Sequence, residues 1–400
     1  MERKNDDMKM NNWQRRLADW FESIEPKGRW AWLGSTYEAF HTFAFTPKTV
    51  TRRGSHVRDA VDMKRAMILV VIALVPALLF GMWNIGYQHY TATATALNSQ
   101  FSILSCFWFG FLRMLPLIVV SYLVGLGIEF MFAQIRHHEV NEGYLVTGLI
   151  IPMIVPVTTP LWQLALAVAF AVVLGKEVFG GSGMNFLNPA LVARAFLFFS
   201  YPSHMSGEGV WIAADLWGTD AIAGATPLAE LAAGSRPTAS ALDMLIGTVP
   251  GSTCETSVIA ILLGALLLLL TGIGSWRIML SVMLGGGLTG LLFNAFGGNA
   301  YMELPFYYHY LMGGFMFGAV FMTTDPVTSA QTNMGKWIYG FLIGAFAVVL
   351  RVLNPAYPEG MMLSILLMNC FAPLIDHCVL TRNIKGRQRR AAGGRKEAAL

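Results

Sequence analysis

The chain has 400 residues, of which 55% are hydrophobic and only 13% are charged, and its formal net charge is +4. Soluble domains carry about 25% charged residues, so a water-soluble fold of this composition would expose large apolar patches. The composition therefore excludes an ordinary soluble globular protein. It predicts an all-α polytopic membrane protein.

Ten apolar segments approach the roughly 17–25 residues that a helix needs to cross a bilayer. We therefore expect about ten transmembrane helices. Some segments are short, which favours broken or re-entrant helices that are buried against their neighbours. In chain order the segments are 66–84, 113–133, 144–160, 161–178, 189–204, 256–273, 278–296, 310–323, 337–353 and 360–378.

Basic residues gather at the two ends of the chain. Residues 1–65 hold 13 of the 28 Lys and Arg residues, and residues 379–400 hold 7. Because positive charge marks the cytoplasmic side, both termini are predicted to be cytoplasmic. The polar segment 205–255, in which Arg236 is the one basic residue, is predicted to be periplasmic.

An internal repeat supports this arrangement. "FLNPALVARAF" (186–196) precedes the fifth segment and "VLNPAYPEGMM" (352–362) precedes the tenth, on opposite sides of the membrane. Two inverted five-helix repeats are therefore expected. The predicted division is a cytoplasmic basic N-terminal segment, a first repeat, a periplasmic loop, a second repeat and a cytoplasmic basic tail: 1–63, 64–204, 205–255, 256–378 and 379–400.

Charged residues inside the apolar segments are candidates for function, because insertion of each costs about 2.5–3.5 kcal/mol. Glu129, Arg194 and Asp376 are such residues. The alternative for each is a salt bridge or a cap within the bundle. Arg194 is taken as a cofactor-binding candidate.

Two polar stretches interrupt the apolar pattern. "FGGSGMNFLNPALVARAF" (179–196) offers the amides of Asn185 and Asn188, which suit the edge of a flat heterocycle, although a hinge loop would look similar. "FMTTDPVTSAQTNMGK" (321–336) surrounds Asp325 with hydroxyl and amide residues. Irregular polar backbone persists at membrane depth only around a cavity, a cofactor or an ion.

The predicted periplasmic segment 205–255, called the outer segment below, contains "DAIAGATPLAEL" (220–231). A residue before proline is extended, so Thr226 is predicted to cap a short helix that begins at Pro227. A plain cap explains this pattern. A phosphoester on the Thr226 oxygen would also suit the positive helix end.

Together these residues resemble the family of B subunits from sodium-translocating NADH:quinone oxidoreductases (Nqr), and less closely the Rnf membrane flavoprotein subunits. The resemblance runs from about residue 45 to residue 387. Its blocks are "HVRDAVDMKR" (56–65), "HEVNEGYLVT" (138–147), "KEVFGGSGMNFLNPAL" (176–191), "RAFLFFSYP" (194–202), "GATPL" (224–228), "DPVTSAQTNMGKW" (325–337) and "VLNPAYPEGMMLSIL" (352–366).

The resemblance implies two flavins. FMN would be esterified to Thr226 within a motif that begins at Asp220 and includes Gly224 and Ala225, with Ala223 in place of the family's hydroxyl residue. Riboflavin would bind without a covalent bond near the cytoplasmic side. The positions that match the family's riboflavin-binding residues are Asn185, Asn188 and Asp325.

The resemblance also implies that ubiquinone is reduced near Gly125 and Glu129, where Leu126 replaces a family glycine, and that Asp376 is linked to Na⁺. Electrons would pass from FMN to riboflavin to ubiquinone, coupled to Na⁺ translocation. The chain would lie in the bacterial inner membrane, in a complex of about six subunits. A periplasmic FMN subunit and an NADH-oxidising FAD/iron–sulfur subunit are the expected protein partners, and no nucleic acid is expected.

Two alternatives remain. One is an Rnf-type membrane flavin subunit. The other is a secondary transporter with inverted repeats and no flavin, because the repeats and the charged residues at membrane depth fit that class as well. Covalently attached FMN would distinguish a flavoprotein from the transporter.

Overall fold

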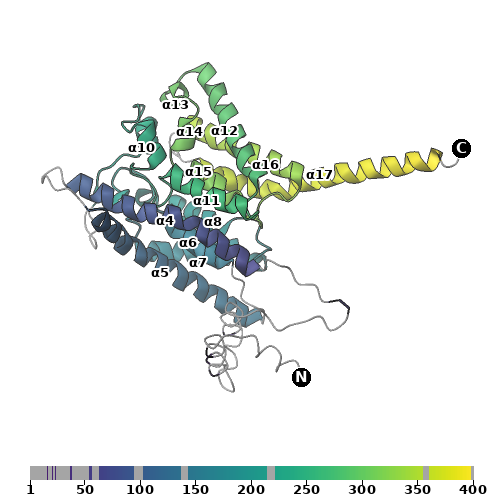
Figure 1. The fold of residues 1–400 in the computed structure, drawn as a ribbon, viewed down its shortest axis with the longest axis horizontal. Helices are drawn as coiled ribbons and strands as arrows, with labels where there is room; N and C mark the ends of the chain where they lie inside the picture. The colour runs from purple at the N-terminus through teal and green to yellow at the C-terminus, as the bar shows by residue number, and fades with distance from the viewer. Residues whose placement is uncertain are drawn as a thin grey trace.

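The computed structural model describes residues 16, 20, 23, 37, 54–55, 63–93, 102–136, 143–213, 221–354 and 360–397. Asp220 and nearly all of the basic N-terminal segment lie outside these residues. The described chain is an all-α polytopic membrane protein with one small β-ribbon (Figure 1). The predicted fold class is confirmed.

The helices follow the predicted order of segments. The first half contains α4 (Met63–Thr93), α5 (Ile103–Arg136), α6 (Tyr144–Ile154), α7 (Leu161–Gly175), η3 (Glu177–Phe179), α8 (Pro189–Ser200) and η4 (Pro202–His204). The outer segment contains β1 (Ile212–Ala213), β2 (Ala221–Ile222), α9 (Pro227–Ala232) and α10 (Ala241–Ile246). The second half contains α11 (Val258–Leu270), α12 (Trp276–Phe296), α13 (Ala300–Glu303), α14 (Tyr308–Leu311), α15 (Phe315–Phe317), the π-helical turn η5 (Gly318–Met322), α16 (Asn333–Leu353) and α17 (Met361–Glu397).

Among the described residues, six helices are long and apolar enough to cross a membrane, and α6, α8 and α11 are shorter apolar helices. The remaining expected segment, 310–323, is divided among α14, α15 and η5. Gly313, with a φ of +61°, separates α14 from α15. Broken elements of this kind are tolerated at membrane depth where protein surrounds them, and Phe315, Phe317 and Met322 are fully buried.

The first long helix extends further outward than the sequence pattern predicted. Segment 66–84 was expected to end before an outer loop, yet α4 continues to Thr93. Its last turns support the β-ribbon, because the His89 ring stacks on Phe109 at 4.0 Å and its Nδ1 lies 2.7 Å from the Ala213 carbonyl oxygen. Contacts with the outer segment therefore lengthen the helix.

The two halves share a second sequence repeat. Helix α7 contains AFAVVL at 169–174 and α16 contains the same letters at 345–350. In both copies the third and fourth residues are fully buried, namely Ala171 and Val172 in α7 and Ala347 and Val348 in α16. Helix α7 packs on α5 and α8, and α16 packs on the corresponding α12 and α17. This correspondence supports the proposal of two related halves.

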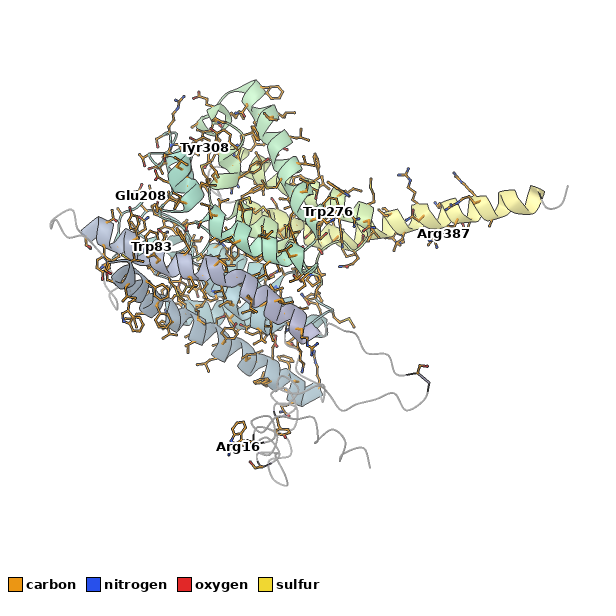
Figure 2. All side chains as sticks on the ribbon, in the orientation of Figure 1. Arg16, Trp83, Glu208, Trp276, Tyr308 and Arg387 are labelled. Carbon is orange, nitrogen blue, oxygen red and sulfur yellow. The ribbon has the colours of Figure 1, made fainter. Side chains whose placement is uncertain are left out.

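Helix α17 passes the expected end of the bundle at residue 378 and continues to Glu397. Figure 1 shows it leaving on the side where α4 begins and α5 ends. Figure 2 shows Arg387 on the protruding part, and this side chain is exposed. The predicted tail is thus largely a helical extension, since no proline follows Pro373 to interrupt it.

Candidate functional site

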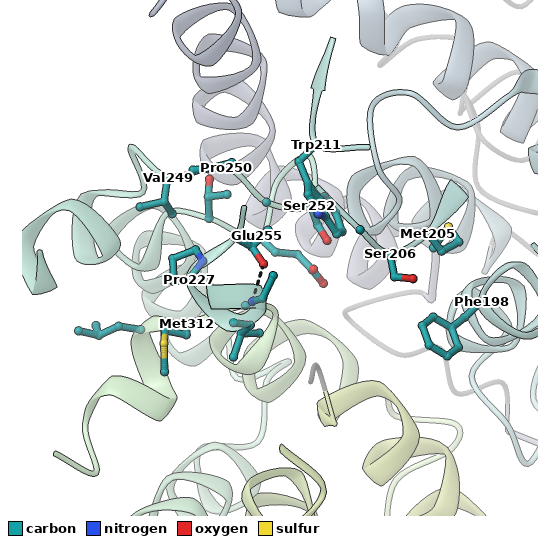
Figure 3. A pocket seen from close by; sticks show the side chains of 18 of the residues that line it. Phe198, Met205, Ser206, Trp211, Pro227, Val249, Pro250, Ser252, Glu255 and Met312 are labelled. Atoms are coloured by element: carbon teal, nitrogen blue, oxygen red, sulfur yellow. Dashed lines mark hydrogen bonds between the residues drawn. The ribbon is translucent and has the colours of Figure 1, made fainter. Parts of the chain in front are cut away.

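One pocket lies beside the predicted FMN-bearing threonine. We call it the outer pocket. In Figure 3, Glu255 lies between Trp211 and Pro227, and Phe198 lies at one edge. The lining residues come from α8, the outer segment, the residues just before α11, and the end of α14 with the turn that follows it: Arg194, Phe198, Met205, Ser206, Gly207, Trp211, Thr226, Pro227, Leu228, Ala229, Val249, Pro250, Gly251, Ser252, Glu255, Thr256, Leu311, Met312 and Gly313.

Thr226 is the N-cap of α9, as its Thr-Pro sequence predicted. Its backbone is extended, with ψ at 154°, and its Oγ1 accepts a hydrogen bond from the Ala229 N–H at 3.1 Å. The cap uses a lone pair of the oxygen and leaves the hydroxyl hydrogen without an acceptor among the described residues. Replacing that hydrogen by a phosphoryl group would keep the cap.

The residues around Thr226 are held by the β-ribbon and by α13. The Gly224 N–H donates to the Glu208 carbonyl at 2.9 Å. A Cβ on Gly224 would lie 2.4 Å from Ile212 Cδ1, so this glycine permits close packing on β1. The Tyr301 hydroxyl donates to the Leu228 carbonyl at 2.8 Å. Burial raises the pKa of Tyr301 to about 12, so the donor stays protonated at neutral pH.

Arg194 lines the same outer pocket as Thr226. Its guanidinium is paired with Glu255 at 3.1 Å, and it donates to the Ser252 hydroxyl at 3.3 Å and to the Ile154 carbonyl. Both charged side chains are nearly fully buried. This pair joins α8 to the segment before α11, so the predicted cofactor-binding arginine also has a structural task.

A second pocket, the inner pocket, contains the three predicted riboflavin residues: Asn185, Asn188 and Asp325. Two polar segments that are far apart in sequence meet there, and they carry the three residues that the resemblance grouped. The whole lining is Ala66, Met67, Val70, Gly143, Val146, Thr147, Ile150, Lys176, Ser182, Gly183, Asn185, Asn188, Pro189, Leu268, Ile273, Gly274, Phe321, Thr324, Asp325, Pro326 and Val327.

The amide of Asn188 connects the two polar segments. Its Nδ2 donates to Asp325 at 3.2 Å, while its Oδ1 accepts from the Ala190 N–H at 3.0 Å and caps α8. Asp325 also accepts from the Val327 N–H at 3.1 Å and the Thr328 hydroxyl at 3.0 Å. Asn188 and Asp325 therefore use part of their hydrogen-bonding capacity to hold the local structure.

Hydrogen-bonding capacity nevertheless remains in the inner pocket. Asn185 uses one amide hydrogen, which it donates to the Leu187 carbonyl at 3.0 Å, and a side-chain amide carries two. The buried hydroxyl oxygen of Ser182 has no hydrogen-bond partner within the described part of the chain. Together with Lys176, these groups could bind the polar edge of a flat heterocycle.

The two pockets lie at opposite ends of the same helices. Helix α8 begins beside Asn188 of the inner pocket and reaches Phe198 of the outer pocket, while α11 begins two residues after Thr256 of the outer pocket and reaches Leu268 of the inner one. At 1.5 Å per residue, these helical stretches separate the pockets by about 15–20 Å.

Glu129 forms a buried ion pair with Lys176, and the exposed fractions of the two side chains are 4% and 6%. Lys176 is buried at the end of α7 and lines the inner pocket. The neighbouring Glu177 pairs with Arg136 at 3.3 Å. Glu129, the acid of the predicted quinone site, is thus connected to the inner pocket through Lys176.

Gly125 lies one helical turn before Glu129 on the buried face of α5. A Cβ at Gly125 would lie 1.9 Å from the Tyr144 hydroxyl oxygen, so this glycine admits the tyrosine ring. The Tyr144 hydroxyl donates to the Ser121 carbonyl at 2.9 Å. Neither Gly125 nor Glu129 is in the lining of the inner pocket.

Asp376, the predicted Na⁺ residue, anchors the start of α16. Its carboxylate accepts from the backbone N–H groups of Gln331 at 2.7 Å and Thr332 at 3.0 Å, and from the Thr332 hydroxyl at 2.6 Å. These three groups donate hydrogen bonds, whereas a cation needs oxygen lone pairs. In the part of the chain that the structure describes, no group of three or more His, Cys, Asp and Glu side chains could hold a metal ion.

Several residues of these sites were missed from the sequence. Ser182 and Trp211 carry no motif that separates them from ordinary loop residues. Lys176 directly precedes Glu177 at a helix end, which is typical of a solvated turn. Its partner Glu129 lies 47 residues earlier in the chain. No sequence signal connects two residues at that separation.

The chain matches the NQR2, RnfD, RnfE family over residues 50–385. Proteins named as the B subunits of a Na(+)-translocating NADH-quinone reductase are similar over nearly the whole chain. The protein from Ectopseudomonas mendocina (strain ymp) is 47% identical over 91% of this chain and 96% of its own length. The proteins from Azotobacter vinelandii (46%, 91% and 96%) and Pseudoalteromonas atlantica (45%, 94% and 99%) are comparable. The chain therefore belongs to the NQR2, RnfD, RnfE family.

Proposed function

We propose that this chain is the membrane flavoprotein subunit of a Na⁺-translocating NADH:quinone oxidoreductase. The names of its relatives and their coverage of the chain support this function. We place it in the bacterial inner membrane with both termini in the cytoplasm, because 20 of the 28 basic residues lie in 1–65 and 379–400. Other subunits of the complex, including an NADH-oxidising one, would supply the electrons.

FMN is proposed to be esterified to Thr226. The half-buried hydroxyl lies in the lining of the outer pocket, and its hydrogen is not used by the helix cap. The lining combines aromatic and apolar side chains, such as Trp211 and Phe198, with the polar Ser206 and Ser252. This is the composition expected for a flavin, whose ring is apolar on its faces and polar at its edge. Arg194 contributes by holding the wall of the pocket.

Riboflavin is proposed to bind in the inner pocket. Asn185, Asn188, Asp325 and Ser182 supply donors and acceptors around an otherwise apolar cavity. A bound flavin supplies one-electron chemistry, and the residues around it set its orientation and exclude water. Ubiquinone reduction is proposed to occur near Gly125 and Glu129, as the resemblance implies. Asp376 is kept as the proposed Na⁺ residue.

The observation that carries the proposal is the geometry of Thr226, a pocket-lining cap whose oxygen can be esterified without loss of its hydrogen bond. The test is fluorescence of the denatured chain on a gel under ultraviolet light, after expression in a host with the flavin transferase. We expect a fluorescent band in the wild type and complete loss in Thr226→Ala. Ser240→Ala, which removes the N-cap of the neighbouring helix α10, is the matched control and should keep the band.

Two other outcomes would change the proposal. A wild-type chain without fluorescence would contradict covalent FMN and favour the flavin-free secondary transporter. A fluorescent chain in a complex that shows no Na⁺-dependent NADH:quinone activity would favour the Rnf-type protein.

A further inference from the structure

Lys176 has an unusual position between two sites. Its ammonium pairs with Glu129 on one side, and the residue lines the inner pocket on the other. It also lies 6.0 Å from the centre of the Tyr144 ring. Among the described residues that line the inner pocket, Lys176 is the one cation. Lys176 is therefore the lining residue whose positive charge could stabilise a negative charge that forms in this pocket.

The backbone and the side chain of Lys176 have different partners. The carbonyl oxygen accepts from the N–H groups of Phe179 and Gly181, each at 3.2 Å, and so organises the glycine loop. The ammonium donates to Glu129. An ammonium has three hydrogens on a flexible four-carbon stem, so it can change its orientation while the loop stays in place.

The neighbouring charged side chains have other partners, so Lys176 is the charged residue that connects Glu129 with the inner pocket. Glu177 is paired with Arg136, and the carboxylate of Asp325 accepts from Asn188, Val327 and Thr328. In a low-dielectric interior the attraction between a cation and a nearby anion is much stronger than in water. A new negative charge in the inner pocket would therefore compete with Glu129 for the same ammonium.

We propose that Lys176 is a positioning residue that divides its positive charge between Glu129 and the occupant of the inner pocket. This inference rests on the proposed function, in which the occupant is riboflavin. Arrival of one electron, supplied by NADH oxidation in the complex, adds one negative charge to the occupant. No bond to the protein forms or breaks. Lys176 stabilises that charge, which favours reduction, and at the same time weakens its contact with Glu129.

The first experiment measures the midpoint potential of the riboflavin in the purified complex by spectroelectrochemical titration. The comparison is made in a Glu129→Gln background, so that removal of the lysine leaves no unpaired buried acid. Addition of Lys176→Met should make one-electron reduction at least tenfold less favourable, which is about 59 mV for one electron. Addition of Lys176→Arg keeps the charge and should keep the potential near that of Glu129→Gln alone.

The second experiment records infrared difference spectra between the oxidised and reduced complex with Glu129 intact. We expect a carboxylate band that shifts on reduction in the wild type and in Lys176→Arg. The shift should be absent in Glu129→Gln, which identifies the band, and in Lys176→Met.

The outcomes separate the inference from the function it rests on. Equal potentials with lysine and with methionine would overturn the role of Lys176 while leaving riboflavin in place. Loss of riboflavin from Lys176→Met/Glu129→Gln would also overturn it, because the ammonium would then bind the oxidised flavin instead of responding to its charge. A wild-type complex from which no riboflavin can be extracted would contradict the proposed function itself.

Discussion

The outer and inner pockets each have a buried ion pair in or behind the wall, but the two pairs differ in kind. In the outer pocket, Arg194 contacts Glu255, Ser252 and the Ile154 carbonyl. At the inner pocket, Lys176 contacts Glu129 and lies near the aromatic ring of Tyr144. A guanidinium is a rigid planar fork that can satisfy several acceptors at once, whereas an ammonium is a point charge on a flexible stem.

This difference suggests different tasks for the two walls. The outer pair joins three separate segments and would hold the pocket in one shape around a covalently attached group. The inner pair has one acid and one ammonium on a flexible stem, beside a site whose occupant is proposed to change charge. This difference can be tested by substituting residues in or near each pocket.

The largest effect on stability is expected at the outer pair. Arg194→Met leaves Glu255 buried without its cation and should destabilise the protein by about 3–5 kcal/mol. Thermal unfolding of the detergent-solubilised complex measures this change. The double variant Arg194→Met/Glu255→Gln removes both charges and should recover most of the loss. A single variant as stable as the wild type would show that the outer wall does not depend on this pair.

A smaller effect is expected beside the inner pair, where Gly125 admits the Tyr144 ring. Gly125→Ala should destabilise the protein by about 1–3 kcal/mol, because the added Cβ overlaps the ring. Gly127→Ala is the matched control on the same helix, since its Cβ would meet nothing within 4 Å. It should be stabilising by about 0.5–1 kcal/mol, because alanine is the better helix former. Equal shifts in unfolding temperature for the two variants would contradict the packing role.

A variant of Asp376 tests whether this carboxylate binds an ion or holds the backbone at the start of α16. Asp376→Asn replaces one acceptor oxygen by a donor that faces the N–H groups of Gln331 and Thr332. A loss of about 1–3 kcal/mol is expected from the unsatisfied groups, again by thermal unfolding. The Na⁺ dependence of quinone reduction is measured on the same variant. Unchanged dependence would remove Asp376 from the proposed Na⁺ pathway.

The smallest effect on stability is expected from Ser182→Ala in the inner pocket. The hydroxyl has no partner among the described residues, so the free energy of unfolding should change by no more than about 0.5 kcal/mol. If this hydroxyl binds riboflavin, the affinity should fall roughly two- to tenfold, which is the net contribution of one hydrogen bond. Retention of riboflavin after dilution of the complex measures the affinity. A marked loss of stability would instead indicate a structural hydroxyl.

Local chemistry explains which predictions succeeded. Thr226 was predicted to cap its helix ahead of a proline, and it does so through a bond to the residue three positions later. Asn188, which also precedes a proline, caps α8 in the same way through bonds to residues two and three positions later. The two polar interruptions of the apolar sequence were recognised separately, and only the resemblance grouped Asn188 with Asp325; the structure brings their side chains together at 3.2 Å. The roles of Thr226, Asn185, Asn188 and Asp325 as flavin-binding residues stay predictions.

The sequence by itself determined the class of the protein, the order of its apolar segments and the caps that begin its helices, because composition and short-range hydrogen bonds depend on neighbouring residues. Only the tertiary structure decided which charges are paired. Arg194 and Glu255 are 61 residues apart and Lys176 and Glu129 are 47 apart, so no local pattern connects them. Burial then leaves each charge dependent on its partner, because the interior offers no water to replace it.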